Sequence, residues 1–163
     1  MGIWWTLFGA TVAALAVFLW VRRPGLANWR QRNLERAQQN FRIQRERLEA
    51  VFLHKAANSG RPRGLRWTGC DFGDDVTYAR ERRHGALLAF VSVTISFEAI
   101  EGGPMEDVEA VGNLRAATAI FTCTRDGWKT DGRAVFNLEP AEAIARYEHE
   151  FELVGHTGQN VDG

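Results

Sequence analysis

An uncharged segment near the start of the chain, residues 3–21, constrains this sequence more than any other feature. A helix of that length extends roughly 28 Å at about 1.5 Å per residue, which is close to the hydrocarbon thickness of a bilayer. Trp4 and Trp5 lie at one end of the segment and Trp20 at the other, and tryptophan rings favour the headgroup level of a membrane. The pattern predicts a single transmembrane helix over residues 3–21.

The charges beside this segment predict its orientation. Arg22 and Arg23 follow it directly, and no charged side chain precedes it. Because basic residues are retained on the cytoplasmic side, we expect residues 1–2 outside and the rest of the chain in the cytoplasm. A cleaved signal peptide is the alternative, which is disfavoured because the segment lacks a basic leader and a small-x-small site before Arg22.

The charge of the remaining chain is strongly divided. Residues 22–66 hold twelve Arg or Lys against three Glu, whereas residues 67–163 hold eight against seventeen Asp or Glu. A basic stretch beside a bilayer is attracted to anionic headgroups. We therefore expect membrane lipid as a partner, with headgroup contacts from Arg22, Arg23, Arg30 and Arg32. Lipid phosphate is nearer to this stretch than nucleic-acid phosphate, so no nucleic-acid partner is expected.

A basic juxtamembrane helix is predicted over residues 22–60, because helix-favouring residues follow Pro24-Gly25 and end at Asn58-Ser59-Gly60. Its apolar residues have nearly heptad spacing: Ala27, Leu34, Ala37, Phe41, Leu48 and Val51. The favoured interpretation is that this stripe packs on the domain's own sheet. The alternative is a parallel coiled coil between two copies, which would make the chain a homodimeric scaffold through residues 27–51.

After Gly64 the apolar residues alternate with a period of two, which is typical of strands. We expect a short strand over 65–70, an acidic turn over 71–75 and a second strand over 76–82 that turns at Arg83-His84-Gly85. The clearest strand covers 87–99. Strands over 114–124 and 128–138 are expected to pair through Asp126-Gly127, a dipeptide that favours tight hairpins.

A last helix is expected to begin at Pro140, since proline is favoured in the first turn. Its apolar residues Ile144, Tyr147 and Phe151 are three and four apart. We expect residues 155–163 to form a disordered tail.

This element order predicts an α+β fold. The transmembrane helix precedes an α+β domain over residues 61–154, in which a long helix packs on a curved antiparallel sheet of about five strands with a short C-terminal helix. In element order alone the chain resembles the cystatin-like and nuclear-transport-factor-like architectures. The resemblance implies no functional residues.

Two groups of residues are candidate binding sites. Alternation places Ser92, Thr94, Ser96 and Glu98 on one face of the long strand. These side chains line a pocket between helix and sheet, or they form the solvated face of an open sheet.

The second group lies in the acidic loop 101–113, where apolar side chains are spaced among charges. Such a loop docks a partner or folds back on its own sheet. The predicted partner-binding residues are Met105, Glu106, Asp107, Val108 and Glu109.

Catalytic and metal-binding patterns are not found. The four histidines, His54, His84, His149 and His156, lack the spacing of a zinc site and are expected to be solvated surface residues. Cys70 and Cys123 are too few for a disulfide framework. Asp71-Phe72-Gly73 occurs without the other parts of a kinase. We therefore expect no cofactor, no metal and no catalytic residues.

Three functional hypotheses follow. The first is a membrane-anchored accessory or assembly subunit, whose cytoplasmic domain binds a protein partner or a second copy. The second is a small-molecule-binding or enzymatic domain with a pocket between helix and sheet. The third is the homodimeric scaffold described above.

Overall fold

The computed structural model describes residues 31–58, 64–106 and 114–157. The chain divides into two compact units, Met1–Arg42 and Ile43–Gly163. Residues 31–58 are helical throughout and are called the long helix below, so the boundary between the units falls within it. In the described part of the chain, no helix combines the length and apolar character of a membrane span. The predicted span over 3–21 lies outside the described residues.

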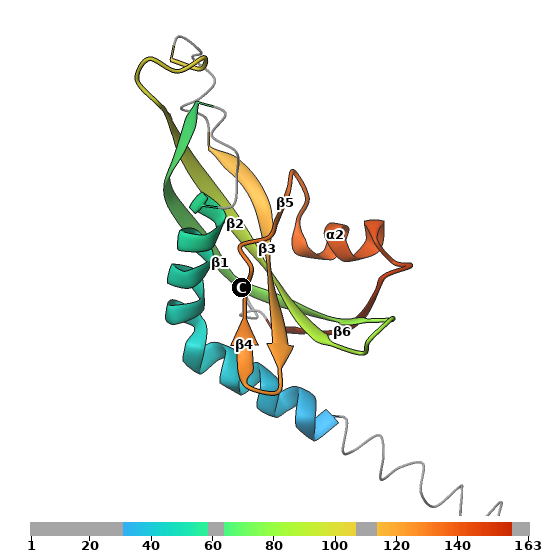
Figure 1. Cartoon of the computed structure of the whole chain (residues 1–163). Helices are drawn as coiled ribbons and strands as arrows, with labels where there is room; N and C mark the ends of the chain where they lie inside the picture. The colour runs from blue at the N-terminus through green and yellow to red at the C-terminus, as the bar shows by residue number, and fades with distance from the viewer. Residues whose placement is uncertain (1–30, 59–63, 107–113, 158–163) are drawn as a thin grey trace, which may run out of the picture. The chain divides into compact units, whose positions relative to one another are not determined.

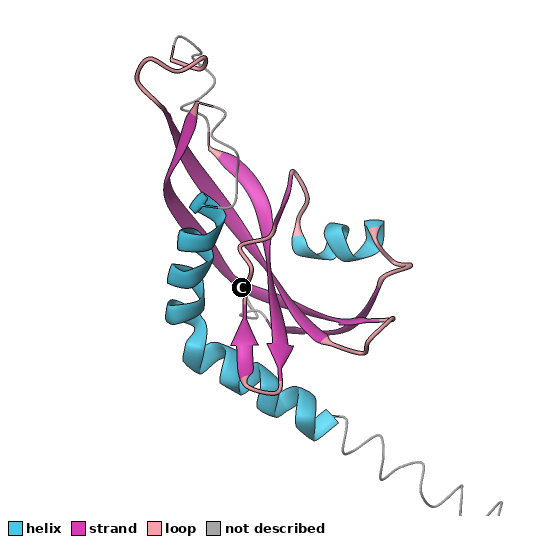
Figure 2. Cartoon of the chain, in the orientation of Figure 1, coloured by secondary structure: helices cyan, strands magenta, loops and turns pink. Residues whose placement is uncertain are grey.

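The second unit is built on a six-stranded antiparallel sheet in the order β4-β3-β2-β1-β6, with β5 also paired to β3 (Figures 1 and 2). The strands are β1 (Leu65–Glu81), β2 (Leu87–Ala99), β3 (Arg115–Thr124), β4 (Gly127–Lys129), β5 (Ala134–Phe136) and β6 (Phe151–Thr157), and the short helix is α2 (Pro140–Arg146). The predicted α+β class, with a helix packed on an antiparallel sheet, is confirmed.

One face of the sheet is covered by the part of the long helix that belongs to the second unit. Phe52 is fully buried, and its ring lies 5.6 Å from that of Phe72 on β1 and 5.9 Å from that of Phe121 on β3. Phe121 stands opposite Ala89 of β2. Alternation along β2 therefore places Val91 and the other odd-numbered apolar residues under the helix.

The opposite face of the sheet is covered by α2, which lies across the sheet from residues 43–58 in Figure 1. Phe90 and Ile120 of the sheet pack with Ile144 of α2 and Phe151 of β6 in one buried cluster, and the Phe90 and Phe151 rings are 5.4 Å apart. Both faces of the central strands are thus buried. This explains why β2 is rich in β-branched and aromatic residues.

The start and end of α2 follow from its local sequence. Pro140 occupies its first turn, and Glu139 and Glu142 form a capping box in which Glu142 Oε2 accepts from the Glu139 backbone N at 3.1 Å. The helix ends at Arg146, and Tyr147 is its C-cap. The predicted start of this helix is confirmed.

The first part of the sheet differs from the expectation of two strands separated by an acidic turn. Residues 65–81 form one strand, in which Phe72 pairs with Val93 and Val76 pairs with Val91. Gly73, Asp74 and Asp75 therefore form a bulge inside β1. The bulge lets the strand continue because its carbonyl groups find another partner, the guanidinium of Arg45 on the long helix, which donates to Gly73 O and, at 3.0 Å, to Asp74 O.

The strand expected over 128–138 is divided into β4 and β5. The break is at Gly132, whose φ of +81° does not fit a strand. Thr130 stabilises the connection, because its Oγ1 donates to Ile120 O and accepts from Gly132 N, each at 3.1 Å.

The strand β6 was not expected. The sequence pattern places Phe151 in the last helix and Gly155, His156 and Thr157 in a disordered tail, but all four belong to β6. The strand pairs with β1 from Glu81–Phe151 to Val76–Thr157. The sheet therefore has six strands rather than about five, and the folded domain extends at least to residue 157.

Candidate functional site

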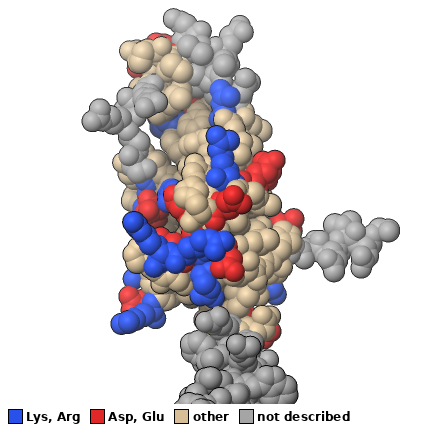
Figure 3. Space-filling view, turned by 90° about the vertical axis from the view of Figure 1, so that its right-hand side faces the viewer, with Lys and Arg blue, Asp and Glu red and all other residues tan. Residues whose placement is uncertain are grey.

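The described residues line a charged cleft of about 620 Å³. Its lining residues are Glu81, Arg82, Arg83, His149 and Glu150. The first three come from the end of β1 and the turn into β2, and the other two come from the connection between α2 and β6. We call this hollow the charged cleft. Figure 3 shows basic and acidic side chains gathered together on this face of the molecule.

Hydrogen bonds from Arg82 join the two segments that line the charged cleft. Its backbone N donates to Glu150 O at 2.8 Å, and its Nε donates to Glu148 O at 2.9 Å. Its Nη1 also lies 3.8 Å from Glu152 Oε2. These contacts continue the β1–β6 ladder beyond the strands and fix the position of the Arg82 side chain.

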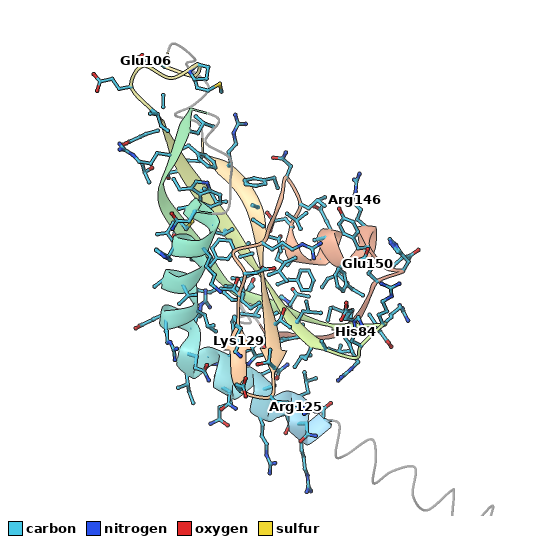
Figure 4. All side chains as sticks on the ribbon, viewed as in Figure 1. His84, Glu106, Arg125, Lys129, Arg146 and Glu150 are labelled. Carbon is cyan, nitrogen blue, oxygen red and sulfur yellow. The ribbon has the colours of Figure 1, made fainter. Side chains whose placement is uncertain are left out.

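The carboxylates of the charged cleft both have an imidazole neighbour. Glu81 Oε2 lies 3.1 Å from His84 Nδ1, and Glu150 Oε1 lies 3.5 Å from His149 Nε2. Both imidazoles are largely exposed, with 72% and 71% of the side chain accessible, as the sequence predicted for surface histidines. Figure 4 shows His84 and Glu150 at the same end of the sheet.

The chemistry available in the charged cleft is that of guanidinium, imidazole and carboxylate groups. None of the residues that line it carries a hydroxyl or a thiol, so the lining can bind charged groups and transfer protons but offers no side-chain nucleophile of the serine or cysteine type. Among the described residues, no group of three or more His, Cys, Asp or Glu side chains is placed to hold a metal ion.

The predicted pocket residues are only partly brought together. Ser92 and Thr94 line a smaller hollow of about 160 Å³, together with Asp71 of β1 and Glu139 at the start of α2. This hollow lies on the α2 side of the sheet, because Ser92 and Thr94 alternate with the residues that pack under the long helix.

Ser96 and Glu98, the other two predicted pocket residues, lie farther along β2 and do not line this hollow. Glu98 accepts from Arg66 Nη2 at 2.9 Å on the surface. No part of the predicted set faces the interior between helix and sheet, which is filled by apolar side chains such as Phe52 and Phe121.

The predicted partner-binding loop is described only as far as Glu106. Glu106 Oε2 accepts from the backbone N of Gly102 at 2.8 Å, so this carboxylate stabilises its own loop. Met105 is half-buried, and its Cγ lies close to Gly64. Figure 4 shows Glu106 at the opposite end of the sheet from His84 and Glu150. The remaining residues of the set, Asp107, Val108 and Glu109, lie outside the described residues.

Of the four arginines predicted to contact lipid, only Arg32 is described, and it is exposed on the long helix. Arg22, Arg23 and Arg30 lie outside the described residues.

No local sequence pattern predicts the charged cleft, because the cleft depends on pairing between distant segments. Arg82 and Arg83 are separated from His149 and Glu150 by more than sixty residues, and they meet only because β6 pairs with β1. Only Phe151, Glu152 and Leu153 alternate there, because Val154 is apolar, and three residues are too few to identify a strand.

No protein-family model, no curated protein and no solved structure matches this chain.

Proposed function

We propose that this chain is a single-pass membrane-anchored protein whose α+β domain is an accessory or interaction subunit of a membrane-associated assembly. The observation that carries the proposal is the uncharged segment 3–21, bounded by tryptophans and followed directly by Arg22 and Arg23. A tether of this kind holds the domain at the membrane. Binding a partner at the membrane requires suitable side chains on the surface of the domain and does not require catalytic residues.

The loop 101–113 remains the proposed partner-binding segment, with a different role for one of its acids. Because Glu106 bonds the backbone of Gly102, its removal would alter the loop as well as its charge. Asp107 and Glu109 are therefore the better residues for a test of partner recognition. The apolar side chains proposed to accompany them are Met105 and Val108.

The test is purification of the tagged full-length protein from native membranes in a gentle detergent. We expect a protein partner in fixed stoichiometry with the wild-type chain and its loss from the Asp107→Ala/Glu109→Ala variant. A matched control is Glu46→Ala/Asp75→Ala, which removes the same charge from two exposed acids elsewhere. Recovery of the lone chain, or equal capture by all three proteins, would contradict the proposal.

A small-molecule-binding role is the second candidate, and the observation that favours it is the hollow beside Ser92 and Thr94. Its volume of about 160 Å³ is below the roughly 300 to 1,000 Å³ of most ligand pockets. The predicted position between helix and sheet is occupied by buried apolar side chains. This role is therefore second to the interaction subunit.

The homodimeric scaffold needs an apolar stripe that is available on the long helix. Phe41 and Leu48 are 1% and 5% exposed, whereas Ile43 is 74% exposed. A dimer through this helix would therefore use Ile43 rather than the predicted stripe, and disulfide trapping of an Ile43→Cys variant is the corresponding test.

A further inference from the structure

We propose that the charged cleft binds the phosphate group of a phosphate monoester through Arg82 and Arg83. The inference does not rest on the proposed partner-binding function, because it concerns the opposite end of the sheet from the loop that contains Glu106.

The first argument is that Arg82 is held in place before any ligand arrives. Its Nε donates to Glu148 O, and its Nη1 lies near Glu152. Its Nη2 has no partner within the described part of the chain. An arginine that is already ordered loses less conformational freedom when it binds a ligand than a mobile one does.

The second argument is the free charge of Arg83. This residue follows Arg82 in the turn, is exposed and lines the charged cleft. None of the described residues forms a hydrogen bond or an ion pair with its guanidinium. A guanidinium has five N–H donors in a planar arrangement that matches two oxygens of a phosphate. Two arginines with unused donors that line the same cleft therefore favour an oxyanion.

The third argument concerns the two carboxylates of the lining, which would repel an anion if they were uncompensated. Glu81 is paired with His84, and Glu150 is paired with His149. Each carboxylate thus already has an imidazole as its neighbour, whereas Arg83 has no acidic partner among the described residues. Arg83 is therefore the lining charge that a bound anion would satisfy.

The size of the charged cleft indicates that the phosphate is attached to a larger group. A volume of about 620 Å³ far exceeds that of a bare phosphate ion and lies in the range of pockets for organic ligands. A soluble sugar or glycerol phosphate carries such a group, and so does phosphatidic acid in a membrane. The chemistry recognised is the same in both cases.

The test uses the full-length protein in phosphatidylcholine nanodiscs and isothermal titration calorimetry with sn-glycerol 3-phosphate. A second arm measures transfer of fluorescent phosphatidic acid from vesicles to the same nanodiscs. Binding in the first arm identifies a soluble source, and binding in the second arm alone identifies a lipid source. Either result supports the proposal when it depends on the cleft arginines, and the absence of binding in both arms overturns it.

Arg83→Gln is the decisive variant, because its guanidinium bonds no described residue and its removal should leave the fold intact. We expect it to weaken binding by about tenfold or more, since a charge-assisted pair of hydrogen bonds is lost. Arg83→Lys, which keeps the charge without the planar donors, should give an intermediate loss of affinity.

The matched control is Arg125→Gln at the exposed tip of the β3–β4 hairpin (Figure 4). This variant should change affinity by less than about twofold. Equal losses in Arg83→Gln and Arg125→Gln would show unspecific attraction and would also overturn the proposal.

Discussion

At the scale of single residues, Gly132 controls how closely the long helix approaches the sheet. Its φ is +81°, and a Cβ added to it would lie 2.5 Å from the backbone N of Ala56 and 2.8 Å from the carbonyl carbon of Lys55. Backbone atoms of a helix cannot move aside as a flexible side chain can. The position is therefore restricted to glycine both by its conformation and by the space available.

We expect Gly132→Ala to lower the free energy of unfolding by about 3 kcal/mol or more, because left-handed strain and steric overlap add. Gly85→Ala is the matched control, since Gly85 also has a positive φ of +71° but has no atom within 4 Å of the position that the added methyl group would take. Gly85→Ala should lower the free energy of unfolding by only about 1 to 2 kcal/mol. The free energy of unfolding of both variants is measured by denaturant titration of the full-length protein, with tryptophan fluorescence as the signal. Equal losses would show that the helix can retreat from residue 132.

Cys70 gives a prediction about pH. Desolvation by burial raises the pKa of this thiol from 9.0 to about 11, and burial also raises the pKa of the Cys123 thiol. The folded protein therefore holds the Cys70 proton more tightly than the unfolded chain does. Any stability linked to this group is present below pH 9 and is lost as the pH rises toward about 11.

Because the thiolate is the reactive form, Cys70 should be alkylated slowly near neutral pH. In a Cys123→Ser background we expect iodoacetamide to react at pH 8 about 100-fold more slowly with the folded protein than with the denatured protein. The rate should continue to rise beyond pH 9. A folded-state rate that levels off near pH 9 would contradict the raised pKa.

At the scale of secondary-structure elements, Arg45 connects the long helix to the bulge in β1. It donates to the carbonyls of Gly73 and Asp74 and forms an ion pair with Glu49 at 2.7 Å. Its side chain is 21% exposed, so these bonds are partly shielded from water. The bulge carbonyls would lose their protein partner without it.

We expect Arg45→Met to lower the free energy of unfolding by about 1 to 3 kcal/mol, because it leaves two carbonyl acceptors and a carboxylate without their donor. Arg47→Met is the matched control on the same helix, where the side chain is exposed. Its effect should stay within about 0.5 kcal/mol. The two variants are compared by their midpoints of thermal unfolding in the same detergent. Similar midpoints would show that the contacts of Arg45 do not stabilise the fold.

The elements that were predicted correctly are those specified by local sequence. The strand over 87–99, the β3–β4 hairpin at Asp126-Gly127 and the start of α2 at Pro140 each have a signal within a few residues. The acidic stretch 71–75 predicts a turn, because Asp and Gly are typical of turns. Its role as a bulge depends on Arg45, which is 28 residues from Gly73, and no local pattern reports such a contact.

The candidate sites also divide into features specified by local sequence and features that depend on distant contacts. Alternation places Ser92 and Thr94 on one face of β2, and both line a hollow on the α2 side of the sheet rather than between the long helix and the sheet. The charged cleft could not be predicted, because β6 has only seven residues and its pairing with β1 joins segments far apart in the chain. The loop acid Glu106 was interpreted as a surface contact, although its carboxylate bonds Gly102 of its own loop.

At the scale of the whole molecule, the proposed membrane span over residues 3–21 gives the most direct prediction. Arginine at the centre of a membrane helix costs about 2.5 to 3.5 kcal/mol. We expect Val12→Arg/Leu15→Arg to release the protein into the supernatant after alkaline carbonate extraction of membranes, whereas the wild type stays in the pellet. The control Val12→Leu/Leu15→Val preserves apolar character and should also stay in the pellet. Retention of the arginine variant would argue against a span over 3–21.

The pairing of β6 with β1 also determines the order in which the protein can mature during synthesis. The β1–β2 hairpin has both of its strands as soon as residue 99 has left the ribosome. The charged cleft lacks one wall until residues 148–152 emerge and close against Arg82. A nascent chain can therefore fold most of its sheet while it is still unable to hold a ligand. Amide hydrogen exchange should show the same order in reverse, with β6 opening before the central strands.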